Sequence, residues 1–254
     1  PIWITLANIS LYFFREHIPG TFGSLPYWVY ASFFLGSICS IATVGWSVFK
    51  TPEIPPTAEE LAALKAEKIN VFTPFKEIGS AIVDMPKVMW QLALVYLFQW
   101  YALFCYWQNA SKSIAKSVWN TTVYQNNPAY EDAVAWSGLV NGWYNIVTFL
   151  SAFFLLWLAK KISPKMIHVI CLIMAAAGLL IFPHITDKNL LFIPMAGFGI
   201  AWASMMGIPY LLVVHKIPKE RYGVYMGIIN MMIVIPMLFQ TTTFGYILKH
   251  FLDN

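Results

Sequence analysis

Four polar side chains recur along the apolar segment between residues 133 and 158. Ser137, Asn141, Asn145 and Thr148 follow one another at spacings of four, four and three residues. At about 100° per residue of an α-helix, these spacings bring all four to one narrow face. Such a stripe suits the wall of a wet cavity, where amides and hydroxyls hydrogen-bond a polar solute. The alternative is contact between two helices, which small polar residues often join in membranes.

A second helical face mixes aromatic rings with an amide. Gln99, Trp100, Leu103, Tyr106 and Trp107 share this face of the preceding apolar segment. Ring faces pack against the carbons of a pyranose, while an amide both donates to and accepts from hydroxyls. We therefore predict that Gln99 and Trp100 bind a sugar. Trp107 is also compatible with an aromatic belt at the membrane surface.

The last apolar segment carries Asn230, which either lines a cavity or bonds a neighbouring helix. Gly223 and Gly227 lie close to the same face, in a small-xxx-small pattern that allows another helix to approach closely. The segment before it is rich in small residues and contains Pro209. We expect the helix to be interrupted at this proline, as in the broken helices of transporters.

These faces belong to segments that lipid must surround. The chain has 254 residues, of which 59% are hydrophobic and 11% charged, against about 25% charged in soluble domains. Backbone groups in lipid must bond internally, and the long apolar runs do not alternate as barrel strands do. We predict an all-α, polytopic membrane helix bundle with one partial span before residue 14. The six complete spans are expected at residues 27–49, 88–107, 133–158, 166–183, 190–214 and 222–248.

One long polar segment, residues 50–87, divides the chain. It contains two amphipathic helical stretches, at residues 58–68 and 74–84. If this linker is cytoplasmic, alternation of the spans places most lysines and arginines of the connectors on the same side, as the positive-inside rule requires. The sequence thus predicts a cytoplasmic linker between a bundle that ends at residue 49 and a second bundle at 88–254. This bias also explains the net charge of +4 without a nucleic-acid partner.

The sequence lacks the motifs of catalytic, cofactor-binding and metal-binding sites. No Asp or Glu lies within a complete predicted span, and no Ser/His/Asp set, phosphate loop or metal-spaced cluster is present. We therefore expect neither an enzyme nor a cofactor or metal site. His168 and His215, at the linker-side ends of spans, are interpreted as interfacial. The three cysteines lie far apart inside apolar runs, where we expect small buried side chains.

Three stretches carry a resemblance to a known family. Residues 221–230 (RYGVYMGIIN), continuing to IVIP at 233–236, resemble the eleventh helix of sucrose-transporter-like proteins of the major facilitator superfamily. These proteins belong to the glycoside-pentoside-hexuronide cation symporter group. GIAWAS at 199–204 with IPY at 208–210 is similar to their tenth helix, and residues 99–107 to their seventh. Residues 19–56 resemble the sixth helix and its exit into the central loop.

The resemblance implies a fragment from the end of helix five to helix eleven, so that the 88–254 bundle lacks its last helix. It implies alternating-access symport of a mono- or disaccharide, coupled to a proton or other cation, in the cell membrane. Substrate would contact the two faces described and the last helix, with these residues: Gln99, Trp100, Trp107, Asn141, Asn145 and Asn230. The family's cation-site carboxylates lie in the half not represented. Met237 stands where a glutamine is expected. The alternative function is a non-transporting sensor or scaffold built on the same bundle.

Overall fold

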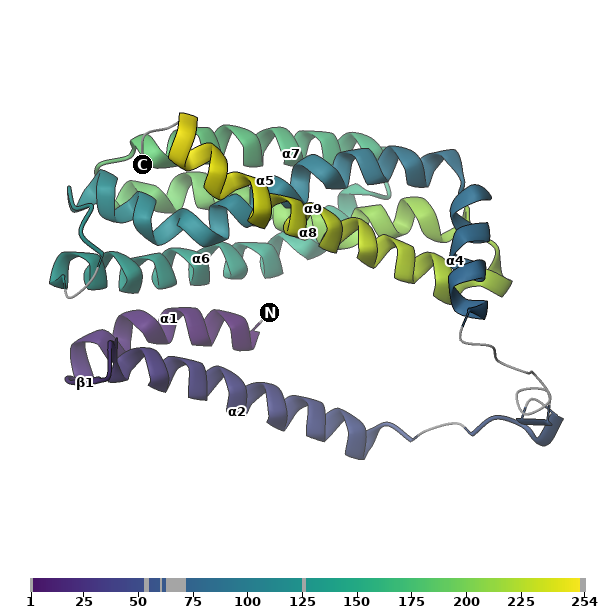
Figure 1. Cartoon of the computed structure of the whole chain (residues 1–254), viewed down its shortest axis with the longest axis horizontal. Coiled ribbons are helices and arrows are strands. Elements are labelled where there is room, and N and C mark those ends of the chain that lie inside the picture. Colours follow the sequence, from purple (N-terminus) through teal and green to yellow (C-terminus); the bar gives the residue numbers. More distant parts are fainter. Residues whose placement is uncertain (1, 53–54, 60, 63–71, 125–126, 252–254) are drawn as a thin grey trace. The chain divides into compact units, whose positions relative to one another are not determined.

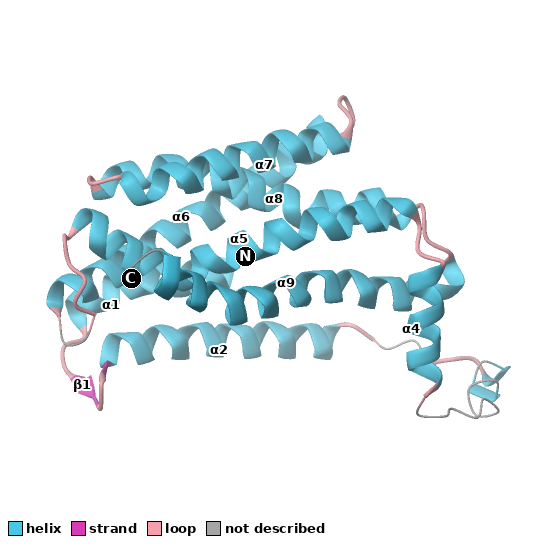
Figure 2. Ribbon diagram, turned by 45° about the horizontal axis from the view of Figure 1, so that its top comes forward, coloured by secondary structure: helices cyan, strands magenta, loops and turns pink. Residues whose placement is uncertain are grey.

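Six long helices dominate a computed structural model of the chain, which describes residues 2–52, 55–59, 61–62, 72–124 and 127–251. Each is long and apolar enough to cross a membrane, which confirms the six predicted spans. These helices are α2 (Tyr27–Lys50), α5 (Lys87–Val118), α6 (Pro128–Leu158), α7 (Pro164–Ile181), α8 (Phe192–Val214) and α9 (Tyr222–Phe251). Figure 2 shows that helix is the main secondary structure of the described chain.

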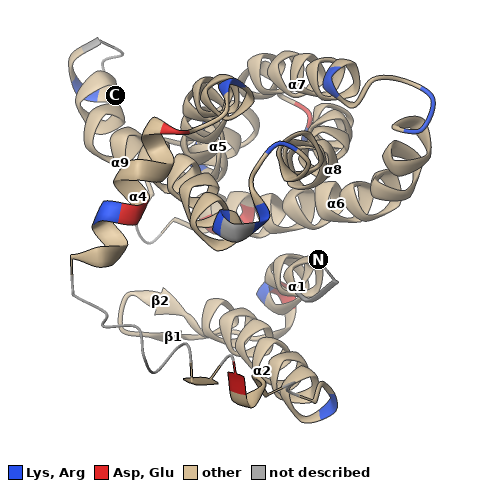
Figure 3. Cartoon of the chain, turned by 90° about the vertical axis from the view of Figure 1, so that its right-hand side faces the viewer, with Lys and Arg blue, Asp and Glu red and all other residues tan. Residues whose placement is uncertain are grey.

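Shorter elements connect or precede the long helices. They are α1 (Ile2–His17), the paired strands β1 (Thr21–Phe22) and β2 (Leu25–Pro26), α4 (Thr73–Val83), and three 3₁₀ turns, η1 (Phe182–His184), η2 (Lys188–Leu191) and η3 (Lys219–Arg221). The amphipathic stretch predicted at 74–84 is therefore α4. The other one, at 58–68, falls mostly on residues outside the described part of the chain. In Figure 3 the long helices are mainly uncharged along their length.

Two helices extend beyond the apolar runs that predicted them. α5 continues to Val118 instead of ending at Trp107, and α6 begins at Pro128 instead of residue 133. The apolar run marks only the part of a helix that lipid surrounds, so polar turns outside the membrane were missed. Asn127 caps α6 by accepting a hydrogen bond from the backbone N–H of Ala129 (3.0 Å), and Pro128 follows at the first helical position.

The expected interruption at Pro209 is absent. α8 runs as one helix from Phe192 to Val214, with Pro209 inside it. Proline removes one backbone hydrogen bond and crowds the preceding turn, but membrane helices tolerate it where neighbouring helices pack around the site. Pro209 is buried.

The chain divides into two compact units, and the first comprises Pro1–Ser40 and Ala102–His215. In this unit α6 packs against α1 on one side and α8 on another, and α7 packs against α8. Glycine permits the closest approach: a Cβ at Gly138 would lie 2.5 Å from the Asn8 carbonyl oxygen of α1. At Gly142 it would lie 2.5 Å from Ile9 Cγ1.

Ion pairs connect α1 and α6 at one end of their contact. The Arg15 guanidinium lies 3.3 Å from Glu131 Oε2 and 3.4 Å from Asp132 Oδ1. Arg15 belongs to the last turn of α1, where a basic side chain also interacts favourably with the helix dipole. The acidic partners lie in the first turns of α6. The two helix ends are therefore on the same side of the membrane.

The second unit comprises Ile41–Tyr101 and Lys216–Asn254. Here α4 contacts α9. Tyr101 on α5 hydrogen-bonds Thr243 on α9 through their hydroxyls (3.0 Å), and the Tyr101 ring lies 6.0 Å from that of Phe239. Tyr96 and Tyr225 are among the largest fully buried side chains of this unit.

The side of the membrane that holds the 50–87 linker remains a prediction, and proteolysis tests it. Protease added to sealed, right-side-out cells should leave the linker intact, because the lysine and arginine bias places it in the cytoplasm. The measurement is an immunoblot of the fragments, with permeabilised cells as the control in which cleavage is expected. Cleavage at the linker in sealed cells would invert the topology.

Candidate functional site

The six predicted binding residues fall into two sets of three. Trp107, Asn141 and Asn145 belong to the first compact unit, while Gln99, Trp100 and Asn230 belong to the second.

The first set lies within a cluster of amides and aromatic rings on α5, α6 and α8. The Tyr106 hydroxyl donates a hydrogen bond to Asn141 Oδ1 (2.8 Å), and Asn145 Nδ2 donates to the Asn141 carbonyl oxygen (2.8 Å). The side chains of Trp107 and Asn145 both interact with the Tyr144 hydroxyl. The structure thus brings all three predicted residues together around two tyrosines that the prediction had not assigned to binding.

Aromatic side chains surround this cluster. The Trp107 ring packs edge-to-face on Trp202 of α8, with centroids 5.4 Å apart. Phe198, also on α8, contacts both tyrosines, at 5.2 Å from Tyr106 and 4.9 Å from Tyr144. Ring faces next to amide and hydroxyl groups provide the contacts that a polyhydroxylated molecule needs.

The whole polar stripe of α6 is hydrogen-bonded within the protein. Ser111 of α5 donates to Ser137 Oγ (3.1 Å). The single hydroxyl hydrogen of Thr148 is shared between two acceptors, the Tyr144 carbonyl oxygen of its own helix (2.8 Å) and the Gly199 carbonyl oxygen of α8 (2.9 Å). These bonds join α6 to α5 near Ser137 and to α8 near Thr148, as the helix-contact alternative requires. Asn141 and Thr148 are only half-buried, so a cavity wall is compatible with the same arrangement.

Cysteine reactivity separates the two roles of this stripe. If the half-buried positions line a wet cavity, Asn141→Cys and Thr148→Cys should react with small polar thiol reagents. Leu156→Cys, on an exposed apolar position of the same helix, should resist because lipid surrounds it. The measurement is the labelling rate of each variant in membranes. Inertness of both test positions would leave the stripe as a contact between helices.

In the second set, Gln99 has unsatisfied hydrogen-bonding groups. Its side chain is 7% exposed, and neither Oε1 nor Nε2 has a hydrogen-bond partner among the described residues. Burying an amide in this way costs about 1–3 kcal/mol. Trp100, the next residue, is also buried and packs edge-to-face with Tyr96 at 6.2 Å. An amide that can still donate and accept is therefore followed in the sequence by a buried aromatic residue.

Asn230 has a different environment. It lies on an exposed face of α9. Apart from adjacent residues and the backbone of their own helix, the two glycines of this face, Gly223 and Gly227, have no described atom within 4 Å of the position that a Cβ would occupy. The close helix approach that their spacing predicted is therefore not made by the described residues.

A buried histidine was missed by the sequence reasoning. His168, which we interpreted as interfacial, is 7% exposed, and its Nδ1 lies 2.8 Å from Ser204 Oγ of α8. A usable signal was present: His168, Cys171, Ala175 and Gly178 recur at spacings of three and four and form a buried stripe. That stripe faces the small residues of α8, so the histidine belongs to the α7–α8 contact.

A cavity in the first unit does not involve the predicted residues. It measures about 250 Å³ and lies between α6, α7 and α8, with Phe154, Leu155 and Met174 among its lining side chains. Its lining is mainly apolar, so a polar solute would find few hydrogen-bond partners there. Among the described residues, no three His, Cys, Asp or Glu side chains form a group that could hold a metal ion.

Comparison with known proteins places the chain in a family. The sequence model of the Major Facilitator Superfamily matches residues 17–241. No curated protein and no solved structure matches the chain. The matched residues include all six candidate spans apart from the end of α9. The family consists of integral membrane proteins that are secondary transporters and are generally not enzymes. Because the match covers most of the sequence, the chain belongs to the Major Facilitator Superfamily.

Proposed function

We propose that this protein transports a mono- or disaccharide by alternating access, with a proton or other cation as the coupling ion. The observation that carries the proposal is the buried Gln99 amide, whose oxygen and nitrogen lack hydrogen-bond partners in the described chain. A sugar hydroxyl donates and accepts at once, so one or two hydroxyls would satisfy both groups. The adjacent Trp100 supplies an apolar ring face for the sugar's carbons.

The cluster around Asn141 supports the same class of substrate. The Trp107 side chain interacts with the Tyr144 hydroxyl of this cluster, and its ring packs against Trp202. Neither set contains a carboxylate or a basic side chain, which favours a neutral polar solute over an ion. Cation coupling rests on the family resemblance, since the predicted spans hold no Asp or Glu.

Transport by the whole protein in sealed vesicles tests the proposal. We expect saturable uptake of one labelled mono- or disaccharide, competition by the same unlabelled sugar, and stimulation by an inward proton or sodium gradient. Empty vesicles are the control. Saturable binding of a sugar without uptake would favour the sensor or scaffold alternative. Neither binding nor uptake across a panel of sugars would reject the sugar assignment.

A further inference from the structure

The short helix α4 lies across the end of two long helices of the second unit. Figures 1 and 2 both show it running crosswise at the ends where α5 and α9 begin, and α4 contacts α9. Only residues 84–86 separate it from Lys87, the first residue of α5. Since α5 and α9 are candidate membrane spans, α4 must lie near the bilayer surface, along the plane of the membrane.

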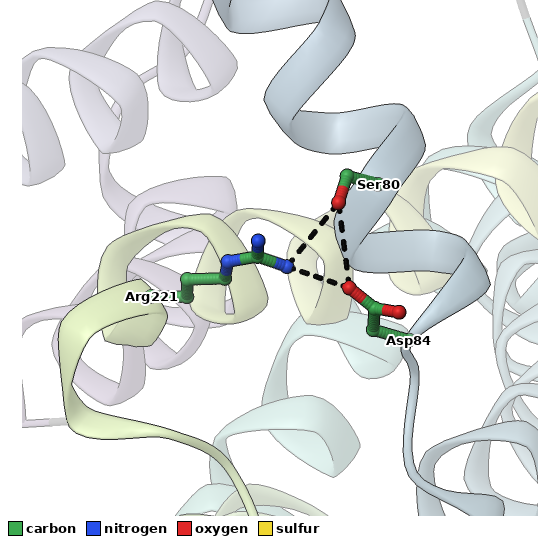
Figure 4. A network of polar contacts seen from close by, with 3 residues as sticks. All are labelled: Ser80, Asp84 and Arg221. Carbon is green, nitrogen blue, oxygen red and sulfur yellow. Dashed lines mark hydrogen bonds and ion pairs between the residues drawn. The ribbon is translucent and has the colours of Figure 1, made fainter.

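An ion pair fixes the end of α4 to the beginning of α9. The Arg221 guanidinium, in the η3 turn, lies 2.9 Å from Asp84 Oδ2 and also donates to Ser80 Oγ (3.4 Å). Ser80 in turn donates to the same carboxylate oxygen at 3.3 Å (Figure 4). All three groups are at least partly exposed, so the contact contributes modestly to stability. The main effect of this ion pair is to hold α4 against the beginning of α9.

One side of α4 carries a row of exposed apolar side chains, which we call the phenylalanine face. Its members extend from the first to the last turn, with exposed fractions of 39% to 84%: Phe75, Ile78, Ile82 and Val83. On a helical projection they occupy an arc of about 140°. Ala81 and Met85 lie outside this arc and are buried, so they provide the contact with the protein. The residues that the structure describes therefore leave the phenylalanine face exposed.

Several basic side chains lie at the same end of the unit as this face. Lys76 lies on α4 next to the phenylalanine face, and Lys87 begins α5. Lys216, Lys219 and Arg221 precede α9 at this end. In Figure 3 α4 bears both a basic and an acidic segment. The acidic residues of α4 are on the other flank, where Asp84 pairs with Arg221.

We propose that α4 is an interfacial helix that inserts its phenylalanine face into an anionic phospholipid surface. A helix lying in the membrane plane can bury its apolar face about 5–10 Å deep at the boundary between headgroups and acyl chains. Lys76 extends toward headgroup phosphates while its methylene groups cover apolar surface. Each basic residue near an anionic leaflet adds about 1 kcal/mol of attraction. A protein partner would need a complementary apolar surface at the same level, whereas lipid is already present there.

Spin labels measure where this face lies. The whole protein is reconstituted in phosphatidylcholine vesicles that contain phosphatidylserine, after Cys39, Cys105 and Cys171 are replaced by alanine. A nitroxide is attached at Phe75→Cys on the phenylalanine face and, as the matched control, at Glu77→Cys on the opposite flank. Power-saturation EPR compares collisions with oxygen, which concentrates in lipid, and with a nickel chelate, which stays in water. We expect the oxygen-to-nickel ratio to be several-fold higher at position 75 than at position 77.

Two results would overturn the proposal. A label at position 75 that meets nickel as often as the label at 77 would mean that the face is in water. A label protected from both reagents would mean that another protein segment covers it. Ile82→Cys repeats the measurement on the last turn in case Phe75→Cys does not fold. In vesicles of phosphatidylcholine alone, or with Lys76→Gln, the ratio at position 75 should fall, and an unchanged ratio would remove anionic lipid from the proposal.

Discussion

Replacing Gln99 with alanine is expected to weaken binding of the transported sugar by about ten- to a hundredfold, which corresponds to the loss of about 1–3 kcal/mol. The substitution removes both groups that lack partners in the sugar-free structure. For the same reason, it should leave the sugar-free protein equally stable or slightly more stable, because a buried amide without partners is itself unfavourable. Isothermal titration and thermal unfolding of the purified whole protein measure the two effects.

Gln91→Ala is the matched control, since it makes the same change on an exposed position of the same helix. It should alter neither affinity nor stability. If Gln99→Ala binds sugar as well as the parent, and is equally well folded, then Gln99 does not contact substrate. If instead Gln99→Ala unfolds at a lower temperature without sugar, its amide has a structural partner, and the observation that carries the proposed function fails.

A second large effect is expected from Gly199→Ala, which should lower the free energy of unfolding by about 1–3 kcal/mol. The added Cβ would lie 2.5 Å from the Tyr144 carbonyl oxygen and 2.9 Å from Val147 Cβ, both on α6. A backbone carbonyl cannot rotate away, so α8 and α6 must separate. The Gly199 carbonyl would then lose its hydrogen bond from Thr148. Thermal unfolding in detergent measures the change.

Gly207→Ala on the same helix is the control, because it should not lower the free energy of unfolding. Apart from adjacent residues and the backbone of α8 itself, no described atom lies within 4 Å of a Cβ at Gly207. Alanine favours a helix over glycine by up to about 1 kcal/mol, so this variant should be neutral or more stable. Equal destabilisation by both substitutions would show that the contact of Gly199 with α6 is not the cause.

The sequence predicted the spans well because the length of an apolar run reflects the thickness of the bilayer. It could not locate the ends of α5 and α6, since polar turns outside the lipid remain helical without changing the hydrophobic pattern. It also could not show that α8 continues through Pro209. Whether a helix continues through a proline depends on packing by neighbouring helices, and the residues around the proline do not reveal this packing.

For the candidate site, helical spacing predicted which residues share a face but not what the face meets. Asn141 and Asn145 were placed on one side of α6, yet their association with Tyr106 and Tyr144 depends on how far a tyrosine hydroxyl reaches between helices. Asn230 differs from these two residues, because the similar pattern on α9 places it on an exposed face and not against another helix of the described chain. His168 shows a third case, because its position near a helix end concealed its burial against Ser204.

The unbroken path of α8 through Pro209 has a mechanical consequence. The Pro209 nitrogen has no hydrogen to donate to the Met205 carbonyl oxygen, so one backbone hydrogen bond of α8 is missing at this point. Gly207, within the same turn, adds a position whose Cβ site has no described atom near it apart from adjacent residues and the backbone of α8. We therefore expect α8 to bend most easily between residues 205 and 209. The segment around Gly199 is held against α6 by close packing and by the hydrogen bond from Thr148. When force is applied to α8, we expect it to bend at residues 205–209 before it bends elsewhere.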